Sequence, residues 1–219
     1  MNAAHGAGGV VIDLSLPFDP DVYPSLDLTV THEADGTRPG GMEFRLGNHI
    51  GTHLDAPSHL VPGAATIDQL PLELFVGEGV VLDLPRGENE AVTASDLEGT
   101  DMVRAGGDIV FVGTGWDARV GQPEYASHHP YLSEDAAHWL VEHEVRMVGM
   151  DVQSVDLGHS LRAEGFRYTS LRILLEAGIP VLHSIARLGE VGTRRCMLAA
   201  APIGFLGADG APARAYAQY

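Results

Sequence analysis

Short apolar runs of the kind that form β-strands are the feature of this chain that most constrains its fold. Several runs contain no polar residue, as expected of strands that are buried on both faces. The stretch 42–46 instead alternates between apolar and charged residues. The candidate strands are 10–14, 28–31, 42–46, 80–84, 109–112, 146–150, 179–182 and 197–201. We therefore expect a substantial sheet.

Two segments have clear helical patterns. The first follows Ser133, a good N-cap, and carries two acids in its first turn, where they suit the helix dipole. The second begins near residues 169–170 and stops at Gly178. A weaker helix is expected near Ser95. Because strands outnumber helices, we expect one α/β domain over residues 1–219, with a mixed sheet and few helices.

Composition excludes several classes of function. The chain has 219 residues and a net charge of −17, which argues against nucleic acid or an anionic membrane as partner. All its basic residues are arginine, so no lysine Schiff base can form. Cys196 is the sole cysteine, which excludes an internal disulfide and favours a reducing, cytoplasmic location. We expect no signal peptide in residues 1–9 and no membrane-spanning segment.

The segment 48–60 contains the residues best suited to catalysis. Its three histidines and one aspartate all sit at odd positions, and the even positions include apolar residues, so a two-residue repeat would place these four on one side. A straight strand would nevertheless put His49 and Asp55 roughly 20 Å apart. The chain must therefore bend, most easily at Gly51 and Pro57, and we expect a curved loop. The polar set is His49, His53, Asp55 and His59.

Two imidazoles and a carboxylate suit one divalent ion, Zn²⁺ or Mn²⁺, with positions left for water and substrate. Such an ion acidifies its water and polarises a carbonyl oxygen. His59, just past the second bend, could then act as general base and acid. A histidine-rich surface loop without metal is the alternative reading.

The same residues carry a family resemblance. Residues 49–59 read His-x-Gly-Thr-His-x-Asp-x-Pro-x-His, which resembles the signature of the metal-dependent cyclase-like amidohydrolases. This family includes bacterial kynurenine formamidase and isatin hydrolase. Further resemblance lies in the segments 12–15, 113–116, 149–156 and 210–214.

The resemblance implies a swivelling β/β/α fold and a homodimer or higher homo-oligomer. It implies that His49, His53 and Asp55 bind the ion and that His59 transfers protons. The implied reaction is hydrolysis of a small non-peptide amide, either an N-formyl aryl amine such as N-formylkynurenine or a lactam such as isatin.

One departure from the family concerns the second metal. Members with two ions carry a histidine and a glutamate at positions that correspond here to Leu171 and His183. Leucine cannot ligate, and His183 could ligate but cannot bridge two ions as a carboxylate can. The sequence therefore favours a single ion. Two alternatives remain: a cyclase or dehydratase acting on a biosynthetic intermediate, and a binding module without turnover.

Three residues are candidates for the substrate pocket: Tyr23, Trp116 and His183. A surface turn is the alternative for Tyr23, and a core position is the alternative for Trp116. We interpret His159 and the pair at 128–129 as surface residues.

Overall fold

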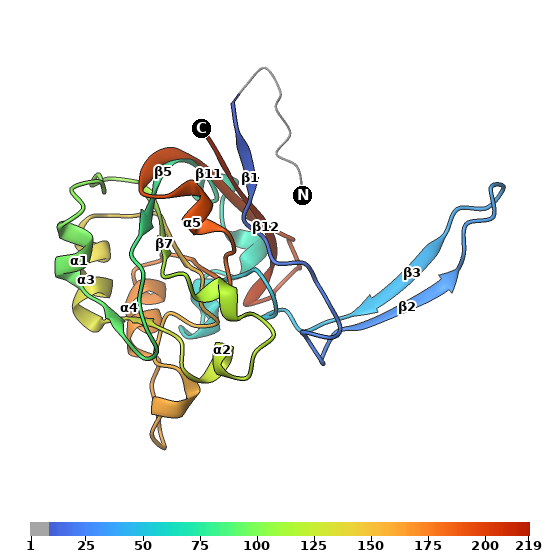
Figure 1. Ribbon diagram of the computed structural model, residues 1–219, viewed down its shortest axis with the longest axis horizontal. Coiled ribbons are helices and arrows are strands. Elements are labelled where there is room, and N and C mark those ends of the chain that lie inside the picture. The colour runs from blue at the N-terminus through green and yellow to red at the C-terminus, as the bar shows by residue number, and fades with distance from the viewer. Residues whose placement is uncertain (1–8) are drawn as a thin grey trace.

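The computed structural model describes residues 9–219. A sheet closed into a barrel lies at its centre, with the strand order β12–β11–β5–β7–β9–β10–β4 and a further pairing of β4 with β12 (Figure 1). β1 extends the sheet along β12. The strands are β1 (Val11–Asp13), β4 (His53–Asp55), β5 (Val76–Asp83), β7 (Ile109–Gly113), β9 (Met147–Met150), β10 (Val181–His183), β11 (Arg194–Pro202) and β12 (Gly210–Gln218).

Strand direction divides this sheet. Neighbours among β5, β7, β9 and β10 are parallel, whereas the other pairings are antiparallel. In β7, Val110 and Val112 belong to one buried cluster, and Ile109 and Phe111 belong to another. Both faces of the strand are therefore buried, which explains its unbroken apolar run.

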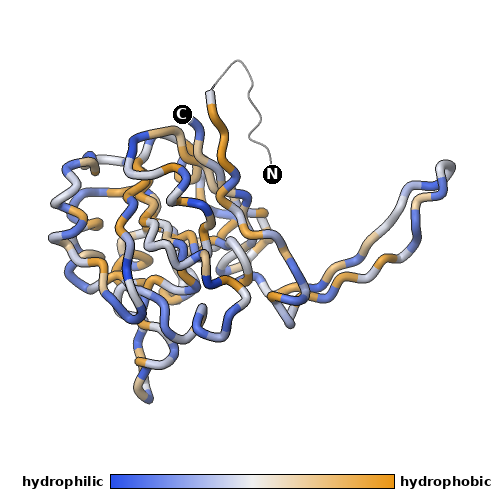
Figure 2. Tube along the Cα trace, in the orientation of Figure 1, coloured by the Kyte–Doolittle hydropathy of each residue, from blue (hydrophilic) through white to orange (hydrophobic). Residues whose placement is uncertain are grey.

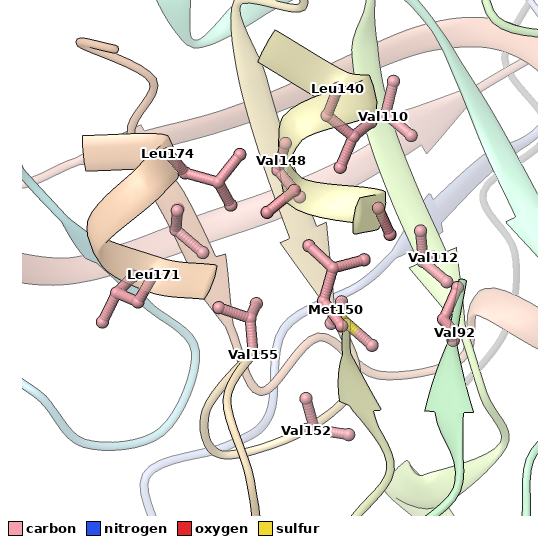
Figure 3. Close-up of a cluster of buried hydrophobic side chains, with 14 of the residues drawn as sticks. Val92, Val110, Val112, Leu140, Val148, Met150, Val152, Val155, Leu171 and Leu174 are labelled. Carbon is pink, nitrogen blue, oxygen red and sulfur yellow. The ribbon is translucent and has the colours of Figure 1, made fainter. Parts of the chain in front are cut away.

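Helices cover the outer face of the barrel. Side chains from α3 and α4 pack against those of β7 and β9 (Figure 3). The backbone of Ser133 is extended before α3, as expected of an N-cap. None of the helices within residues 9–219 has both the length and the apolar character needed to cross a membrane. The helices are α1 (Ala94–Glu98), α2 (Glu124–Ser127), α3 (Glu134–Glu142), α4 (Thr169–Glu176) and α5 (Leu188–Val191).

A two-stranded hairpin, formed by β2 (Asp27–His32) and β3 (Gly41–Arg45), extends away from the barrel (Figures 1 and 2). Leu28 faces Phe44 across the ladder, and Val30 faces Met42, so all four lie on one face. Figure 2 shows apolar segments along both strands. This apolar face is exposed, with fractional exposures of 37% for Leu28, 51% for Val30, 55% for Met42 and 65% for Phe44.

The mixed α/β fold with few helices is confirmed. Two strands of the barrel differ from the sequence-based expectation, since β4 lies in the expected loop and β12 was not among the candidate strands. β12 is rich in alanine, which has a weak preference for strands, and it forms because it pairs with β11, β1 and β4. Residues 1–8, most of the segment examined for a signal peptide, lie outside the described residues. A small separate pair joins β6 (Ala91–Val92) to β8 (Tyr131–Leu132).

Candidate metal centre

β4 places His53 and Asp55 on one face of the barrel wall. Leu54, between them, points to the opposite side and is fully buried in the core. β4 pairs with β10 on one edge and with β12 on the other. In the β10 ladder, His183 lies directly opposite His53. The two-residue repeat expected from the sequence thus holds for these three positions, and the register adds His183 to the polar face.

The chain bends on both sides of β4 at the expected residues. Gly51 has a φ of 58°, and a Cβ there would lie 3.0 Å from the Phe18 ring. Glycine is therefore favoured for two reasons, backbone conformation and space. Pro57 opens a turn of 3-10 helix, Pro57–His59, in line with its preset φ. This turn brings the His59 imidazole back toward the carboxylate of Asp55.

Thr52 fixes the position of the segment that precedes β4. Its buried hydroxyl donates to the backbone oxygen of Ser184 at 2.6 Å and accepts the N–H of Leu16 at 2.8 Å. Both bonds are long-range, so the threonine anchors the motif to the residue after β10 and to the segment after β1.

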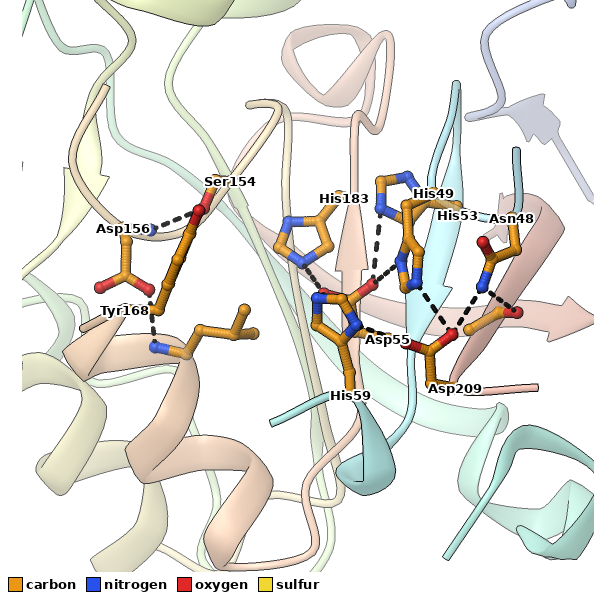
Figure 4. Close-up of polar contacts among 12 residues, drawn as sticks. Asn48, His49, His53, Asp55, His59, Ser154, Asp156, Tyr168, His183 and Asp209 are labelled. Carbon is orange, nitrogen blue, oxygen red and sulfur yellow. Dashed lines mark hydrogen bonds and ion pairs between the residues drawn. The ribbon is translucent and has the colours of Figure 1, made fainter. Parts of the chain in front are cut away.

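Four imidazoles surround the Asp55 carboxylate (Figure 4). On Oδ1, the distances are 2.7 Å to Nδ1 of His49 and 3.5 Å to Nε2 of His53. On Oδ2, they are 3.1 Å to Nε2 of His183 and 3.9 Å to Nε2 of His59. The structure therefore brings together every residue expected to bind the ion or to transfer protons.

The charge states of Asp55 and His53 suit a cation. Burial alone would raise the pKa of Asp55, but the neighbouring imidazoles of His183, His49 and His53 hold it well below its usual range. Burial lowers the pKa of His53 to about 4, so this ring is neutral near pH 7. An ionised carboxylate and a neutral imidazole are the protonation states that a metal ion requires.

Asp209 is a residue of the site that the sequence analysis did not identify. It directly precedes β12, and its carboxylate accepts from Nδ1 of His59 at 2.8 Å and from Nε2 of His49 at 3.1 Å (Figure 4). The side-chain amide of Asn48 also donates to it, at 2.6 Å. The feature of the sequence that could have pointed to Asp209 is its position directly before 210–214, one of the segments that carry the family resemblance. Because Asp209 binds Nδ1–H of His59, the lone pair of that ring is on Nε2, on the side of Asp55.

The donor set fits a divalent ion. Nδ1–H of His53 donates to the Gly51 oxygen at 2.9 Å, which leaves its Nε2 free to ligate. Candidate ligand atoms form two groups, each with all atoms within 4.8 Å of one another. The groups are His49–Asp55–His59 and His53–Asp55–His183. Both groups contain Asp55. Of the other two expected ligands, His49 belongs to the first group and His53 to the second.

Two cavities meet at this cluster. One of about 510 Å³ is lined by Tyr23, Ile50, Tyr125 and both His49 and His53. The hydroxyl of Tyr23 is buried and has no hydrogen-bond partner among residues 9–219. Burial raises the pKa of Tyr23 to about 12, so the hydroxyl keeps its proton and can donate it. The structure thus places Tyr23 in a cavity wall beside the cluster.

The second cavity, of about 240 Å³, lies over the carboxylate of Asp55. His183 and Leu171 line it, and Leu171 brings no ligand atom. His159 is exposed, as expected of a surface residue, and it also lines this cavity.

Trp116 was a candidate for the substrate pocket, but the structure places it in the core instead. It is 3% exposed, belongs to the core beneath the helices, and lines neither cavity. Its indole N–H donates to the Tyr125 oxygen at 3.1 Å. The buried Asp151 carboxylate holds the turn in place by accepting the backbone N–H groups of Thr114, Gly115 and Trp116.

The interpretation of His129 as a surface residue is wrong. It is fully buried, and its Nδ1–H donates to the backbone oxygen of Pro130 at 2.8 Å. Burial lowers its pKa to about 4. This histidine is therefore a neutral structural residue near pH 7.

Comparison with known proteins identifies the family of this chain. Residues 12–157, more than half of the chain, match the Cyclase family, and the chain belongs to that family. It is 30% identical over 188 residues to cyclase-like protein 2 of Oryza sativa subsp. japonica, an alignment that covers 83% of this chain and 66% of that relative. It is 26% identical over 204 residues to kynurenine formamidase of Geobacillus thermodenitrificans, covering 93% of this chain and 92% of that enzyme.

The fold is similar to that of isatin hydrolase A from Ralstonia solanacearum, with a TM-score of 0.82 and 26% identity. The alignment covers 94% of this chain and 90% of that chain. The resemblance noted from the motif at 49–59 is confirmed. Together, these similarities indicate an enzyme that hydrolyses non-peptide C–N bonds.

Proposed function

We propose that this protein is a mononuclear metal-dependent hydrolase of a small amide, either an N-formyl aryl amine such as N-formylkynurenine or a lactam such as isatin. The observation that carries the proposal is the convergence of four imidazoles on one buried carboxylate beside a cavity of about 510 Å³. Ordinary folding gives no reason to gather so many ligating groups around Asp55, whereas a cation does.

His49, His53 and Asp55 are the residues that would hold the ion, Zn²⁺ or Mn²⁺. When bound, the ion supplies Lewis acidity toward the substrate carbonyl and acidifies water at neutral pH. Leu171, without a ligand atom in the smaller cavity, supports one ion rather than two.

His59 moves the proton. Asp209 accepts its Nδ1–H, so Nε2 takes a proton from the attacking water and later returns it to the leaving nitrogen. The carboxylate of Asp209 also stabilises the imidazolium that forms between these two steps. Tyr23 lines the larger cavity, and its hydroxyl, which has no partner among residues 9–219, is the group assigned to donate a hydrogen bond to the substrate.

The test is turnover by purified protein reconstituted with Zn²⁺ or Mn²⁺, with N-formylkynurenine and isatin as the first substrates. Product formation that requires the metal and is lost on chelation supports the proposal. Absence of turnover across a broader panel of N-formyl aryl amines and lactams, with metal bound, contradicts it.

A cyclase or dehydratase reaction on the same site is the second candidate, favoured by the altered positions Leu171 and His183 in the cavity over Asp55. The two reactions differ in the fate of water. In ¹⁸O-labelled water, a hydrolase places the label in its product, whereas ring closure with loss of water does not.

We also propose that the protein forms a homodimer or higher homo-oligomer through the hairpin β2–β3. The support is the exposed apolar face of this hairpin, since isolated two-stranded hairpins are at best marginally stable in water. Phe44→Glu is expected to lower the mass measured by light scattering, whereas Glu43→Gln, on the opposite face, is not. A monomeric wild-type protein at micromolar concentration contradicts the proposal.

A further inference from the structure

The loop between β9 and α4 brings a cation to the site that the mechanism above does not use. Arg162 follows a short 3-10 turn, His159–Leu161, and lines the cavity over Asp55 together with Tyr168. A guanidinium stays protonated at any working pH. Among residues 9–219, only Arg162 therefore adds a permanent positive charge to the wall of either cavity.

The guanidinium of Arg162 is held in place by several contacts. Its Nε–H donates to the backbone oxygen of Leu157 at 2.8 Å, and Nη1 donates to the hydroxyl of Tyr168 at 3.3 Å. Its Cζ lies 4.9 Å from the centroid of the Tyr168 ring and 5.1 Å from that of Phe166. Aromatic rings attract a cation through their faces. These contacts orient the guanidinium without neutralising its charge.

No carboxylate pairs with Arg162 within residues 9–219, and its Nη2 has no acceptor there. Arg195 and Arg214, by contrast, each contact a carboxylate oxygen at 2.6 Å. The buried carboxylate of Asp156 instead accepts two backbone N–H groups at the start of α4, each at 3.0 Å. Arg162 thus retains a charged donor for a partner outside the protein.

Tyr168, which orients Arg162, is itself strained. Its φ of 51° and ψ of 57° are left-handed, a conformation that is costly for a residue with a Cβ. Its ring packs against Phe166, with centroids 5.0 Å apart. Strained residues that persist in a folded protein cluster at functional sites, and Tyr168 lines the cavity over Asp55.

We propose that Arg162 binds a carboxylate of the substrate, so that the preferred substrate is an amide that carries an acidic group. This inference rests on the hydrolase function proposed above and narrows its substrate class. Charge-assisted hydrogen bonds from a guanidinium are strong and directional. In a chain with a net charge of −17, an acidic ligand needs such a local cation. N-formylkynurenine carries a carboxylate, whereas isatin does not.

The arrangement of the cavities suits such a substrate. His49, His53 and Gln153 line both cavities, so the two adjoin at the cluster. A substrate with its amide at the cluster can extend an aryl group into the larger cavity and place its carboxylate beside Arg162 in the smaller one.

The first experiment measures binding without turnover. Calorimetry in the presence of Zn²⁺ compares 4-oxo-4-phenylbutanoate with 1-phenylpentane-1,4-dione, in which a methyl ketone replaces the carboxylate and which contains no amide either. We expect the wild type to bind the acid more tightly by about 10–100-fold, the range expected of a hydrogen bond to a charged group. Arg162→Gln should lose most of this preference.

Three further variants complete the comparison. Arg167→Gln removes the same charge from an exposed residue of the same loop that lines neither cavity, and it should keep the preference. Arg162→Lys retains the charge without the planar fork and should recover part of the preference. Thermal melts establish folding, and Arg162→Met replaces Arg162→Gln if the latter is not folded.

The second experiment measures turnover of N-formylkynurenine and of N-formyl-2-aminoacetophenone, which lacks the carboxylate. Arg162→Gln is expected to raise KM for N-formylkynurenine by about 10–100-fold, with a smaller change in kcat, because the guanidinium binds the substrate and the transition state alike. The ratio of kcat/KM between the two substrates should fall accordingly.

The outcomes separate this inference from the proposed function. A wild type that does not prefer the acid, or an equal preference in folded Arg162→Gln, overturns the role of Arg162; in the second case the carboxylate binds elsewhere, for example to the ion. Metal-dependent hydrolysis of the neutral amide would still support the proposed function. A preference for the acid that depends on Arg162, without hydrolysis of any amide, supports the anion site and rejects the proposed function.

Discussion

Nδ1 of His59 lies 2.8 Å from Oδ2 of Asp209, a contact between residues 150 positions apart in the chain. The same carboxylate contacts Nε2 of His49 through its other oxygen. Asp209 therefore fixes the orientation of the proposed proton-transfer residue and of one proposed ligand. This relationship depends on the pairing of β12 with β4, which places the residue before β12 beside the motif at 49–59.

Replacement of Asp209 by asparagine tests this orientation. An amide can donate toward the ring as well as accept from it, so His59 is no longer held in one tautomer. We expect kcat to fall by about 10²–10⁴-fold, the range associated with loss of general acid–base catalysis. KM should change little, and Asp209→Glu should recover part of kcat. Equal kcat values for wild type and Asp209→Asn in steady-state assays contradict the role of Asp209.

His59→Ala is expected to separate metal binding from turnover. The ring is proposed to move protons and is not among the proposed ligands, so Zn²⁺ content measured by mass spectrometry should remain at the wild-type level. Turnover should fall by about 10²–10⁴-fold. His138→Ala, which removes an exposed ring on α3, is the control. Retained activity in His59→Ala would show that another group transfers the proton.

Acid should destabilise the protein through His129. Burial lowers the pKa of this ring from 6.5 to about 4. Between pH 4 and pH 6.5 the unfolded chain binds a proton at His129 that the folded protein does not bind. The contribution of His129 to the free energy of unfolding is therefore complete above pH 6.5 and decreases as the pH falls toward 4. The slope from this group is about 1.4 kcal/mol per pH unit.

Urea unfolding at a series of pH values measures that slope. His129→Gln should show a shallower loss of the free energy of unfolding between the two pKa values, whereas the exposed-site variant His138→Gln should follow the wild type. Identical slopes for wild type and His129→Gln would show that His129 titrates alike in the folded and unfolded states.

Asp151→Asn is expected to destabilise the turn that carries Trp116. The carboxylate accepts three backbone N–H groups and the Thr114 hydroxyl, and an amide cannot accept all four. Leaving buried donors without partners costs about 1–3 kcal/mol each. We expect a loss of at least about 2 kcal/mol in the free energy of unfolding, measured by tryptophan fluorescence in urea. Glu98→Gln, at an exposed residue, is the control, and a loss no larger than that of this control contradicts the assignment.

Local sequence patterns predicted much of this molecule. The apolar runs indicated the buried strands, and the spacing of His53 and Asp55 around Leu54 indicated one polar face. The need for ligands to converge predicted bends at Gly51 and Pro57, where the chain does bend. These features depend on neighbouring residues alone.

The features that the sequence did not predict depend on tertiary contacts. Asp209 reaches the site through a strand pairing that no local pattern encodes. Trp116 follows a strand, as many pocket residues do, but hydrogen bonds from its turn to Asp151 hold it in the core. The alternation in 42–46 predicted a strand but not its partner, and β2 and β3 form a two-stranded sheet of their own.

Anomalous X-ray diffraction from crystals grown with Zn²⁺ tests the central claim most directly. The account predicts one strong peak per chain, at ligand distance from the carboxylate of Asp55 and from Nε2 of His53. Well-diffracting crystals that lack such a peak, with the imidazoles still gathered around Asp55, would contradict it.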